Sequence, residues 1–215
     1  MQTPLSRVPE STAARLPVYL RVLTELASQD LVSSDELAAA CGVTPAQLRK
    51  DLSFVGTRGT RGVGYDVRTL REALAAELGM QHDWPVVIVG GGNLGLALAN
   101  YSGFAARGLR IVGLVDADIM RAGEVVNSEL RVQPLSDLQK IVHRTHAVIG
   151  VIAVPAESAQ AIADEMVTAG ITGILNFAPT VLNVPDAVEV RDVDFGAELQ
   201  LLAFHEQRRS RGGDA

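Results

Sequence analysis

The sequence contains little cysteine, few aromatic residues and almost no lysine. Its 215 residues include one cysteine, and tryptophan, tyrosine and phenylalanine together make up 4%. The single cysteine, Cys41, excludes an intrachain disulfide and any cysteine-rich zinc site, and it fits a reducing compartment. No apolar run approaches the roughly 20 residues that a membrane-spanning helix needs. We therefore expect a cytoplasmic protein with no metal centre and no membrane partner.

The net charge of −6 is distributed unevenly along the chain. Residues 1–80 contain nine basic and nine acidic residues, whereas residues 81–215 contain ten basic and sixteen acidic residues. Within the neutral part, residues 49–71 hold six basic residues against two acidic ones. A local basic patch on an acidic protein indicates a specific anionic partner rather than general adhesion to anions.

A glycine-rich stretch follows a run of apolar β-forming residues near the middle of the chain. The order is an apolar run at residues 86–89, three glycines, a helical pattern, a second apolar run at residues 111–115, and then Asp116. Strand, glycine turn, helix, strand and acid in this order are typical of a dinucleotide-binding βαβ unit. The predicted phosphate-binding loop consists of Gly90, Gly91, Gly92, Asn93, Leu94 and Gly95.

Each part of this unit has a physical role. Gly90 allows a tight turn, and Gly92 leaves the backbone N–H groups at the helix N-terminus open to a pyrophosphate. Gly95 allows the helix to pack closely on the strands. Asp116 would accept hydrogen bonds from ribose hydroxyls and repel a 2′-phosphate, so we expect NAD(H) rather than NADP(H).

The same alternation of strands and helices continues beyond the βαβ unit. Further strands are predicted at residues 146–154 and 171–177, with a helix capped by Ser136-Asp137 before them. Loops at the carboxyl ends of parallel strands line the ligand crevice of an open α/β sheet. The remaining candidate cofactor residues are therefore Val154, Pro155, Asn176 and Phe177, with ordinary turn residues as the alternative interpretation.

The N-terminal part has the pattern of a helix-turn-helix with a wing. Ser33 or Ser34 caps a short helix, and Thr44 and Pro45 then begin a second helix over residues 45–55. Residues 56–67 alternate glycine and arginine and predict a β-hairpin wing that reaches DNA. The candidate DNA contacts are Gln47, Arg49, Lys50 and Ser53 on the helix and Arg58, Arg61, Gly62 and Tyr65 on the wing. The alternative is an oligomerisation domain with a solvated loop.

The sequence supplies a nucleotide site without an evident catalytic group. Hydride transfer needs a proton relay, yet Lys50 and Lys140 are the only lysines, and the histidines form no constellation with them. Tyr101, expected about one turn into the phosphate-binding helix, could face the ligand, but it forms no catalytic constellation with another residue. We therefore expect a binding protein and no enzyme activity. One alternative is an NAD-dependent dehydrogenase or a CoA-binding module carrying an accessory N-terminal domain. Another is a scaffold protein that does not bind DNA.

The chain resembles the bacterial redox-sensing repressor family Rex over nearly its whole length. The matching segments are STAARLPVYLRVLTEL, QLRKDLSFVGTRGTRGVGYDV, GGGNLG, VPAESA, NFAP and DVDFGAELQ. The sequence departs from the family in one place, between the second helix of the helix-turn-helix, called the reading helix below, and the wing. Phe54-Val55 and Thr57-Arg58 replace the aromatic-rich sequence expected there.

The resemblance implies a fold and a division of the chain. We expect a winged-helix DNA-binding domain at residues 1–80 and a Rossmann-like NAD(H)-binding domain at 81–192. Residues 193–215 would form a C-terminal helix exchanged within a homodimer. The composition alone left open whether this apolar helix docks on its own domain or on a partner.

The resemblance also implies a mechanism. NADH would release double-stranded operator DNA, and NAD⁺ would permit binding. Tyr101 would lie near the nicotinamide, which an apolar side chain at Phe195 would approach from the partner subunit. Asp194 would be a switch carboxylate that pairs with an arginine of the N-terminal helix, here Arg15.

Overall fold

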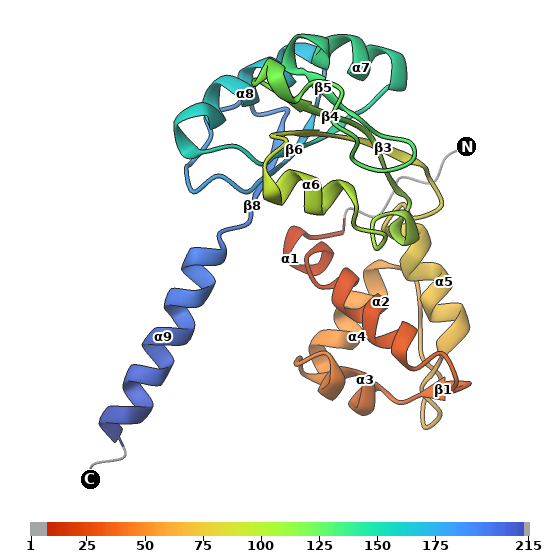
Figure 1. Cartoon of the computed structure of the whole chain (residues 1–215). Helices are drawn as coiled ribbons and strands as arrows, with labels where there is room; N and C mark the ends of the chain where they lie inside the picture. The colour runs from red at the N-terminus through yellow and green to blue at the C-terminus, as the bar shows by residue number, and fades with distance from the viewer. Residues whose placement is uncertain (1–7, 213–215) are drawn as a thin grey trace. The chain divides into compact units, whose positions relative to one another are not determined.

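The computed structural model describes residues 8–212 of the chain, with side chains described as far as residue 210 (Figure 1). The predicted domain ends at residues 1–7 and 213–215 lie outside the described residues. The contacts divide the chain into two compact units between His82 and Asp83. Each unit is described below by itself.

The N-terminal unit is built from short helices and a two-stranded antiparallel ladder. Its helices are α1 (Glu10–Ala13), α2 (Leu16–Glu25), α3 (Ser34–Ala40), α4 (Pro45–Phe54) and α5 (Val67–Glu77), and its strands are β1 (Leu31–Val32) and β2 (Tyr65–Asp66). Pro17 lies in the first turn of α2, where its missing N–H costs no helical hydrogen bond. Ser33 caps α3 in a capping box with Glu36, and Thr44 caps α4 as predicted.

The wing is smaller than the predicted hairpin. A single antiparallel bridge between Thr60 and Gly64 closes a tight turn, and β2 then pairs with β1 rather than with the preceding residues. The sequence pattern did not predict β1. The side chains between these elements form one apolar core, in which the largest fully buried residues are Leu16, Tyr19, Leu23, Leu37, Leu48, Leu52, Leu70 and Leu74.

The second unit is a six-stranded parallel sheet with the order β5-β4-β3-β6-β7-β8. The strands are β3 (Trp84–Val89), β4 (Leu109–Asp116), β5 (Val132–Pro134), β6 (Ile149–Ile152), β7 (Gly173–Asn176) and β8 (Glu189–Asp192). The chain leaves β3 toward β4 on one side and later returns to β6 on the other. This reversal next to β3 is the topological switch point at which open α/β sheets bind ligands.

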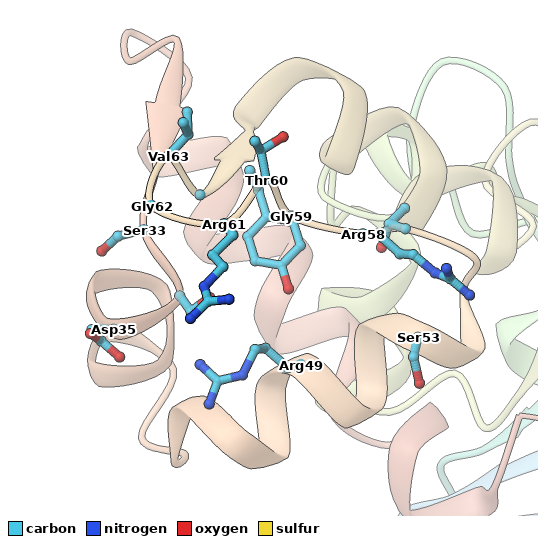
Figure 2. A pocket seen from close by; sticks show the side chains of 14 residues that line it. Ser33, Asp35, Arg49, Ser53, Arg58, Gly59, Thr60, Arg61, Gly62 and Val63 are labelled. Carbon is cyan, nitrogen blue, oxygen red and sulfur yellow. The ribbon is translucent and has the colours of Figure 1, made fainter.

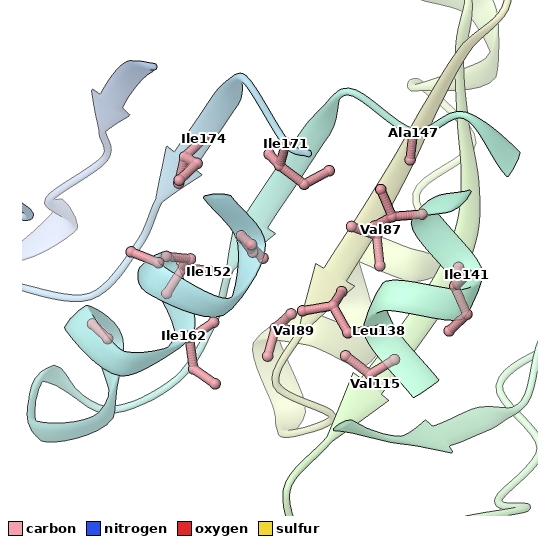
Figure 3. Packing of buried hydrophobic residues seen from close by; sticks show 14 of the residues in the cluster. Val87, Val89, Val115, Leu138, Ile141, Ala147, Ile152, Ile162, Ile171 and Ile174 are labelled. Atoms are coloured by element: carbon pink, nitrogen blue, oxygen red, sulfur yellow. The ribbon is translucent and has the colours of Figure 1, made fainter. Parts of the chain in front are cut away.

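Helices cover both faces of the sheet, as Figure 1 shows. The helices of this unit are α6 (Asn93–Ala99), α7 (Leu138–Thr145), α8 (Ala156–Ala169) and α9 (Phe195–Gly212), and the 3-10 turns are η1 (Ala105–Arg107), η2 (Ile119–Arg121) and η3 (Leu135–Asp137). Alternate residues of β3 face opposite layers. Val87 and Val89 pack with α7 and α8 (Figure 3), whereas Val86 and Ile88 pack in the layer of α6. The predicted α/β Rossmann-like fold with an N-terminal helical domain is confirmed.

Local expectations in this unit needed correction. The predicted strand at residues 146–154 is only Ile149–Ile152, because His146 ends α7 in a left-handed conformation with φ 55°. Ser136-Asp137 does not cap a helix through a side chain; it lies in η3, which runs directly into α7.

The C-terminal helix α9 exposes its apolar side chains. More than half of the surface of Phe195, Leu199, Leu201, Leu202 and Phe204 is accessible in the single chain. No helix in residues 8–212 has both the length and the apolar character needed to cross a membrane.

Candidate nucleotide and DNA-binding sites

The glycine loop between β3 and α6 has the geometry that the sequence predicts. Gly90 has φ +112°, and a Cβ at this position would lie 2.3 Å from the carbonyl oxygen of Ala153, at the end of β6. A Cβ on Gly95 would lie 1.8 Å from the carbonyl oxygen of Gly90, so only glycine lets α6 approach the loop. A Cβ on Gly92 would meet nothing within 4 Å. The open space at Gly92 lies at the switch point, where a pyrophosphate could approach the backbone.

The N-terminus of α6 is free of side-chain caps. Gly92 is the N-cap residue, and Asn93 and Leu94 are the first helical residues. Because no side chain accepts the first N–H groups, they are open to an anion, and the helix dipole favours negative charge there.

Asp116 ends β4 beside this loop and binds the backbone on both sides. Its Oδ2 accepts a hydrogen bond from Gly91 N at 2.6 Å, and its Oδ1 accepts one from Asp118 N at 2.7 Å. The carboxylate therefore fixes the glycine loop to the loop after β4. The sequence predicts that the same carboxylate also accepts hydrogen bonds from a ribose.

The loops after β6 and β7 contain the other candidate cofactor residues. Val154 is half-buried, and Pro155 is the N-cap residue of α8. The ring of Phe177 lies 5.7 Å, between centroids, from the ring of Phe195 at the start of α9. The structure thus brings together two predicted pocket residues that are far apart in the sequence.

Asn176 ends β7, as the sequence predicts, but its side chain is engaged within the protein. Its side chain is fully buried, and its Nδ2 donates to the carbonyl oxygens of Ala178 and Thr180 and to Oδ1 of Asp192, while its Oδ1 accepts from Ala178 N. Both polar atoms are therefore occupied by the protein. Asn176 shapes the loop after β7 instead of offering a hydrogen bond to a ligand.

Tyr101 lies past the end of the phosphate-binding helix rather than one turn into it. Helix α6 ends at Ala99 with Asn100 as its C-cap residue, and the ring of Tyr101 packs edge-on against Phe104 at 5.1 Å. About half of the Tyr101 surface is exposed, beside a cavity of about 540 Å³. Because α6 has seven residues, it is about 10 Å long, and Tyr101 follows its C-terminal end.

In the N-terminal unit, a groove of about 660 Å³ lies between α4, the start of α3 and the wing. Figure 2 shows Arg49 of α4 and Arg61 of the wing directed into this groove, with Arg58 near the Ser53 end of α4. Lys50 is exposed on the same helix. Within the described part of the chain, none of these four cations forms an ion pair. Their charge is therefore available to phosphates.

The remaining candidate DNA contacts differ in their exposure. Ser53 is exposed and donates its hydroxyl to the carbonyl oxygen of Lys50 at 2.6 Å. Gly62 lies in the wing turn with φ +79° and open space around it. Tyr65 is only 6% exposed, and its ring lies beneath Gly59. Tyr65 was predicted to contact DNA, but in the structure its buried ring packs against the wing.

A buried carboxylate on α4 is the feature that sequence reasoning missed. Asp51 is fully buried and accepts hydrogen bonds from Thr12 Oγ1 (2.9 Å), Arg15 Nε and Nη2 (2.7 and 2.8 Å), Tyr19 Oη (2.7 Å) and Gln47 Nε2 (2.8 Å). The network joins α1 and α2 to the reading helix, which is α4.

The network also sets the protonation states of its members. Burial alone would raise the pKa of Asp51, but the hydrogen bonds, led by the one from Arg15, hold that pKa well below its usual range. The Arg15 pKa is raised by its hydrogen bond to Asp51. The Tyr19 pKa is raised by burial and by the neighbouring carboxylate. The Arg15–Asp51 pair is therefore charged at neutral pH.

The two predicted switch residues, Arg15 and Asp194, each have a hydrogen-bond partner within their own unit. Arg15 binds Asp51, and Oδ1 of Asp194 accepts a hydrogen bond from Ala197 N in the first turn of α9. A pairing of Arg15 with Asp194 would therefore have to compete with Asp51. No group of three or more histidine, cysteine or carboxylate side chains that could hold a metal occurs in the part of the chain that was searched, residues 8–212.

A parallel sheet with a nucleotide-binding switch point, in the same chain as a helical unit with a basic groove, defines a DNA-binding regulator with a nucleotide-binding domain. Two family models agree with this division. The model for a putative DNA-binding protein N-terminus matches residues 7–53, and the CoA binding domain model matches residues 81–180.

Relatives and solved structures cover nearly the whole chain. The redox-sensing transcriptional repressor Rex of Streptomyces avermitilis is 58% identical over 94% of this chain and 81% of its own length. Rex of Carboxydothermus hydrogenoformans is 48% identical over 94% and 98%. The structure of the Rex-family repressor RSP with β-NAD⁺ and operator DNA superposes with a TM-score of 0.88 at 33% identity, covering 96% of both chains. The chain belongs to the Rex family of redox-sensing transcriptional repressors.

Proposed function

We propose that this protein represses transcription in response to the cellular NADH/NAD⁺ ratio. It binds operator DNA when free or bound to NAD⁺, and NADH releases it. The observation that carries the proposal is the combination, in one Rex-family chain, of a basic winged-helix groove and an uncapped glycine loop at a switch point. Because both ligands belong to the cell interior, we place its action in the cytoplasm.

The glycine loop and its surroundings would hold the dinucleotide. The N–H groups at the start of α6 would bind the pyrophosphate, and the carboxylate of Asp116 would face the adenosine ribose. Val154, Pro155 and Phe177 would border the nicotinamide half of the crevice, with Tyr101 and Phe195 close to the ring. A bound dinucleotide supplies a ring whose charge changes with its redox state.

That change in charge gives a physical basis for the switch. The reduced nicotinamide is neutral and the oxidised ring is cationic. Phe177 of one subunit and Phe195 of the other would provide an apolar surface around the ring, and burying an unpaired cation there costs far more than burying a neutral ring. If the protein conformation that buries the nicotinamide ring is the one that cannot bind DNA, NADH stabilises that conformation. By linkage, NADH then lowers the fraction of protein bound to DNA.

The exposed apolar face of α9 supports a homodimer. Five large apolar side chains are more than half exposed in the single chain, and an isologous partner would cover them. In such a dimer, α9 is the arm exchanged between subunits, and Phe195 and Asp194 act on the partner's site. Asp194 would then draw Arg15 away from Asp51, which would connect the ligand to the reading helix.

A mobility-shift experiment tests the proposal against the alternatives. A duplex from the protein's own promoter region is mixed with the protein alone and with NADH, NAD⁺ or CoA. The proposal predicts a shifted band that NADH removes and NAD⁺ leaves in place. Release by CoA would support a CoA-binding module, and no shift under any condition would support a scaffold. Turnover of NADH with a small-molecule substrate would support the dehydrogenase alternative, although family membership does not favour it.

A further inference from the structure

The orientation of the Gln47 side chain is fixed by Asp51. Gln47 is the third residue of α4, and its Nε2 lies 2.8 Å from Oδ1 of Asp51 one turn later. An ionised carboxylate only accepts hydrogen bonds, so the amide must turn its nitrogen toward Asp51 and its oxygen away. The usual ambiguity between the two ends of a glutamine amide is therefore removed.

The other end of the amide is open to solvent. Among the described residues, none donates a hydrogen bond to Oε1 of Gln47. No buried side-chain oxygen or nitrogen in this part of the chain lacks a partner, so the unpartnered Oε1 cannot be buried. Asp51 uses one of the two N–H donors. The side chain therefore presents one acceptor and one remaining donor.

This pair of groups matches one base edge in the major groove. A glutamine amide pairs with adenine by accepting from its N6 amino group and donating to its N7. In helix-turn-helix proteins the N-terminal residues of the second helix contact base edges, and Gln47 is at that end of α4. We propose that Gln47 reads an adenine in the operator and that Asp51 is the positioning residue that orients its amide.

The proposal rests on the proposed function and gives the reading helix one specified contact. Asp51 is itself held by Thr12, Arg15 and Tyr19, so the amide is oriented before DNA arrives. Preorganisation of this kind reduces the rotamer entropy lost on binding. The exposed cations Arg49, Lys50 and Arg61 lack such a second layer and suit phosphate contacts, which position the protein without selecting sequence.

The experiment combines base analogues with variants. A duplex is first selected from a random-sequence library with the wild-type protein. Each adenine is then replaced by 7-deazaadenine, which lacks only the N7 acceptor. Affinities are measured for the wild type, for Gln47→Ala and Asp51→Asn, and for the control Gln139→Ala, whose side chain is exposed on α7 of the other unit.

We expect one adenine in each half-site at which the analogue weakens wild-type binding about tenfold. In Gln47→Ala, 7-deazaadenine at that position should no longer weaken binding, whereas its effect at the other adenines should match the wild type. Asp51→Asn should lose most of the effect at that position. Gln139→Ala should respond like the wild type at every adenine. NADH affinity should stay unchanged in Gln47→Ala and Gln139→Ala.

Equal sensitivity of Gln47→Ala and wild type at every adenine would overturn the inference, as would an Asp51→Asn variant that keeps the full wild-type response. The first comparison decides the case even if Asp51→Asn folds poorly. Failure of the wild type to select any duplex would contradict the proposed function instead.

Discussion

Replacing Asp51 by alanine should strongly destabilise the protein. The change leaves Arg15 without its counter-ion and leaves the buried hydroxyls of Tyr19 and Thr12 without their acceptor. Breaking a buried ion pair by removing one partner costs about 3–5 kcal/mol. Arg15 retains 29% side-chain exposure and can be partly hydrated, but each unsatisfied hydroxyl adds about 1–3 kcal/mol. We expect a loss of about 5 kcal/mol in the free energy of unfolding, at the lower end of the combined range because Arg15 stays partly hydrated.

Urea unfolding followed by circular dichroism measures this loss. Domains of this kind are stable by about 5–15 kcal/mol, so the expected change is a large fraction of the total. The matched control is Glu72→Ala, which removes the exposed ion pair with Arg68 on α5 and should have no measurable effect. A loss for Asp51→Ala no larger than that of the control would refute the view that this network holds the reading helix in place.

The same carboxylate predicts a dependence of stability on pH. The folded pKa of Asp51 is lower than the value of an exposed aspartate, about 3.9 in the unfolded chain. Its contribution to stability is therefore present above pH 4, and it is lost as the pH falls below 4 and through the folded pKa. The stability advantage of the wild type over Asp51→Asn should shrink between pH 5 and pH 3. An advantage that stays constant over this range would contradict the assignment.

Three further variants test the other sites. Asp116→Ala should weaken NADH binding, because it removes the hydrogen bond that holds Gly91. In calorimetry it should also narrow the preference for NADH over NADPH. An unchanged preference would mean that another group selects the cofactor. Arg61→Ala should lower operator affinity on all sequences and reduce the salt slope by about one, with NADH affinity unchanged. Leu202→Glu, on the exposed face of α9, should shift the protein toward monomer in sedimentation experiments; an intact dimer would place the interface elsewhere.

Several features that local sequence patterns specify were predicted correctly. The apolar run Val86–Val89, the glycine turn and the second strand ending at Asp116 together indicated the sheet and its switch point. Thr44 and Pro45 marked the start of the reading helix. These signals act over a few residues, so one sequence carries them completely.

The features that depend on distant contacts were missed or misplaced. Asp51 gathers donors that lie 32 to 39 residues earlier in helices α1 and α2, and nothing near it in the sequence marks it as buried. Tyr65 faces the core because β2 pairs with β1, and the face of a two-residue strand cannot be known without its partner. Asn176 is buried by a loop whose path the turn residues alone do not fix.

The central claim is that the redox state of a bound dinucleotide controls DNA binding. The most direct measurement is the fraction of labelled operator bound at a fixed total concentration of NADH and NAD⁺, while their ratio is varied. We expect full binding in pure NAD⁺ and progressive release as the NADH share rises, with tighter binding of NADH than of NAD⁺ in calorimetry. A bound fraction independent of the ratio, or equal affinities for the two dinucleotides, would contradict it.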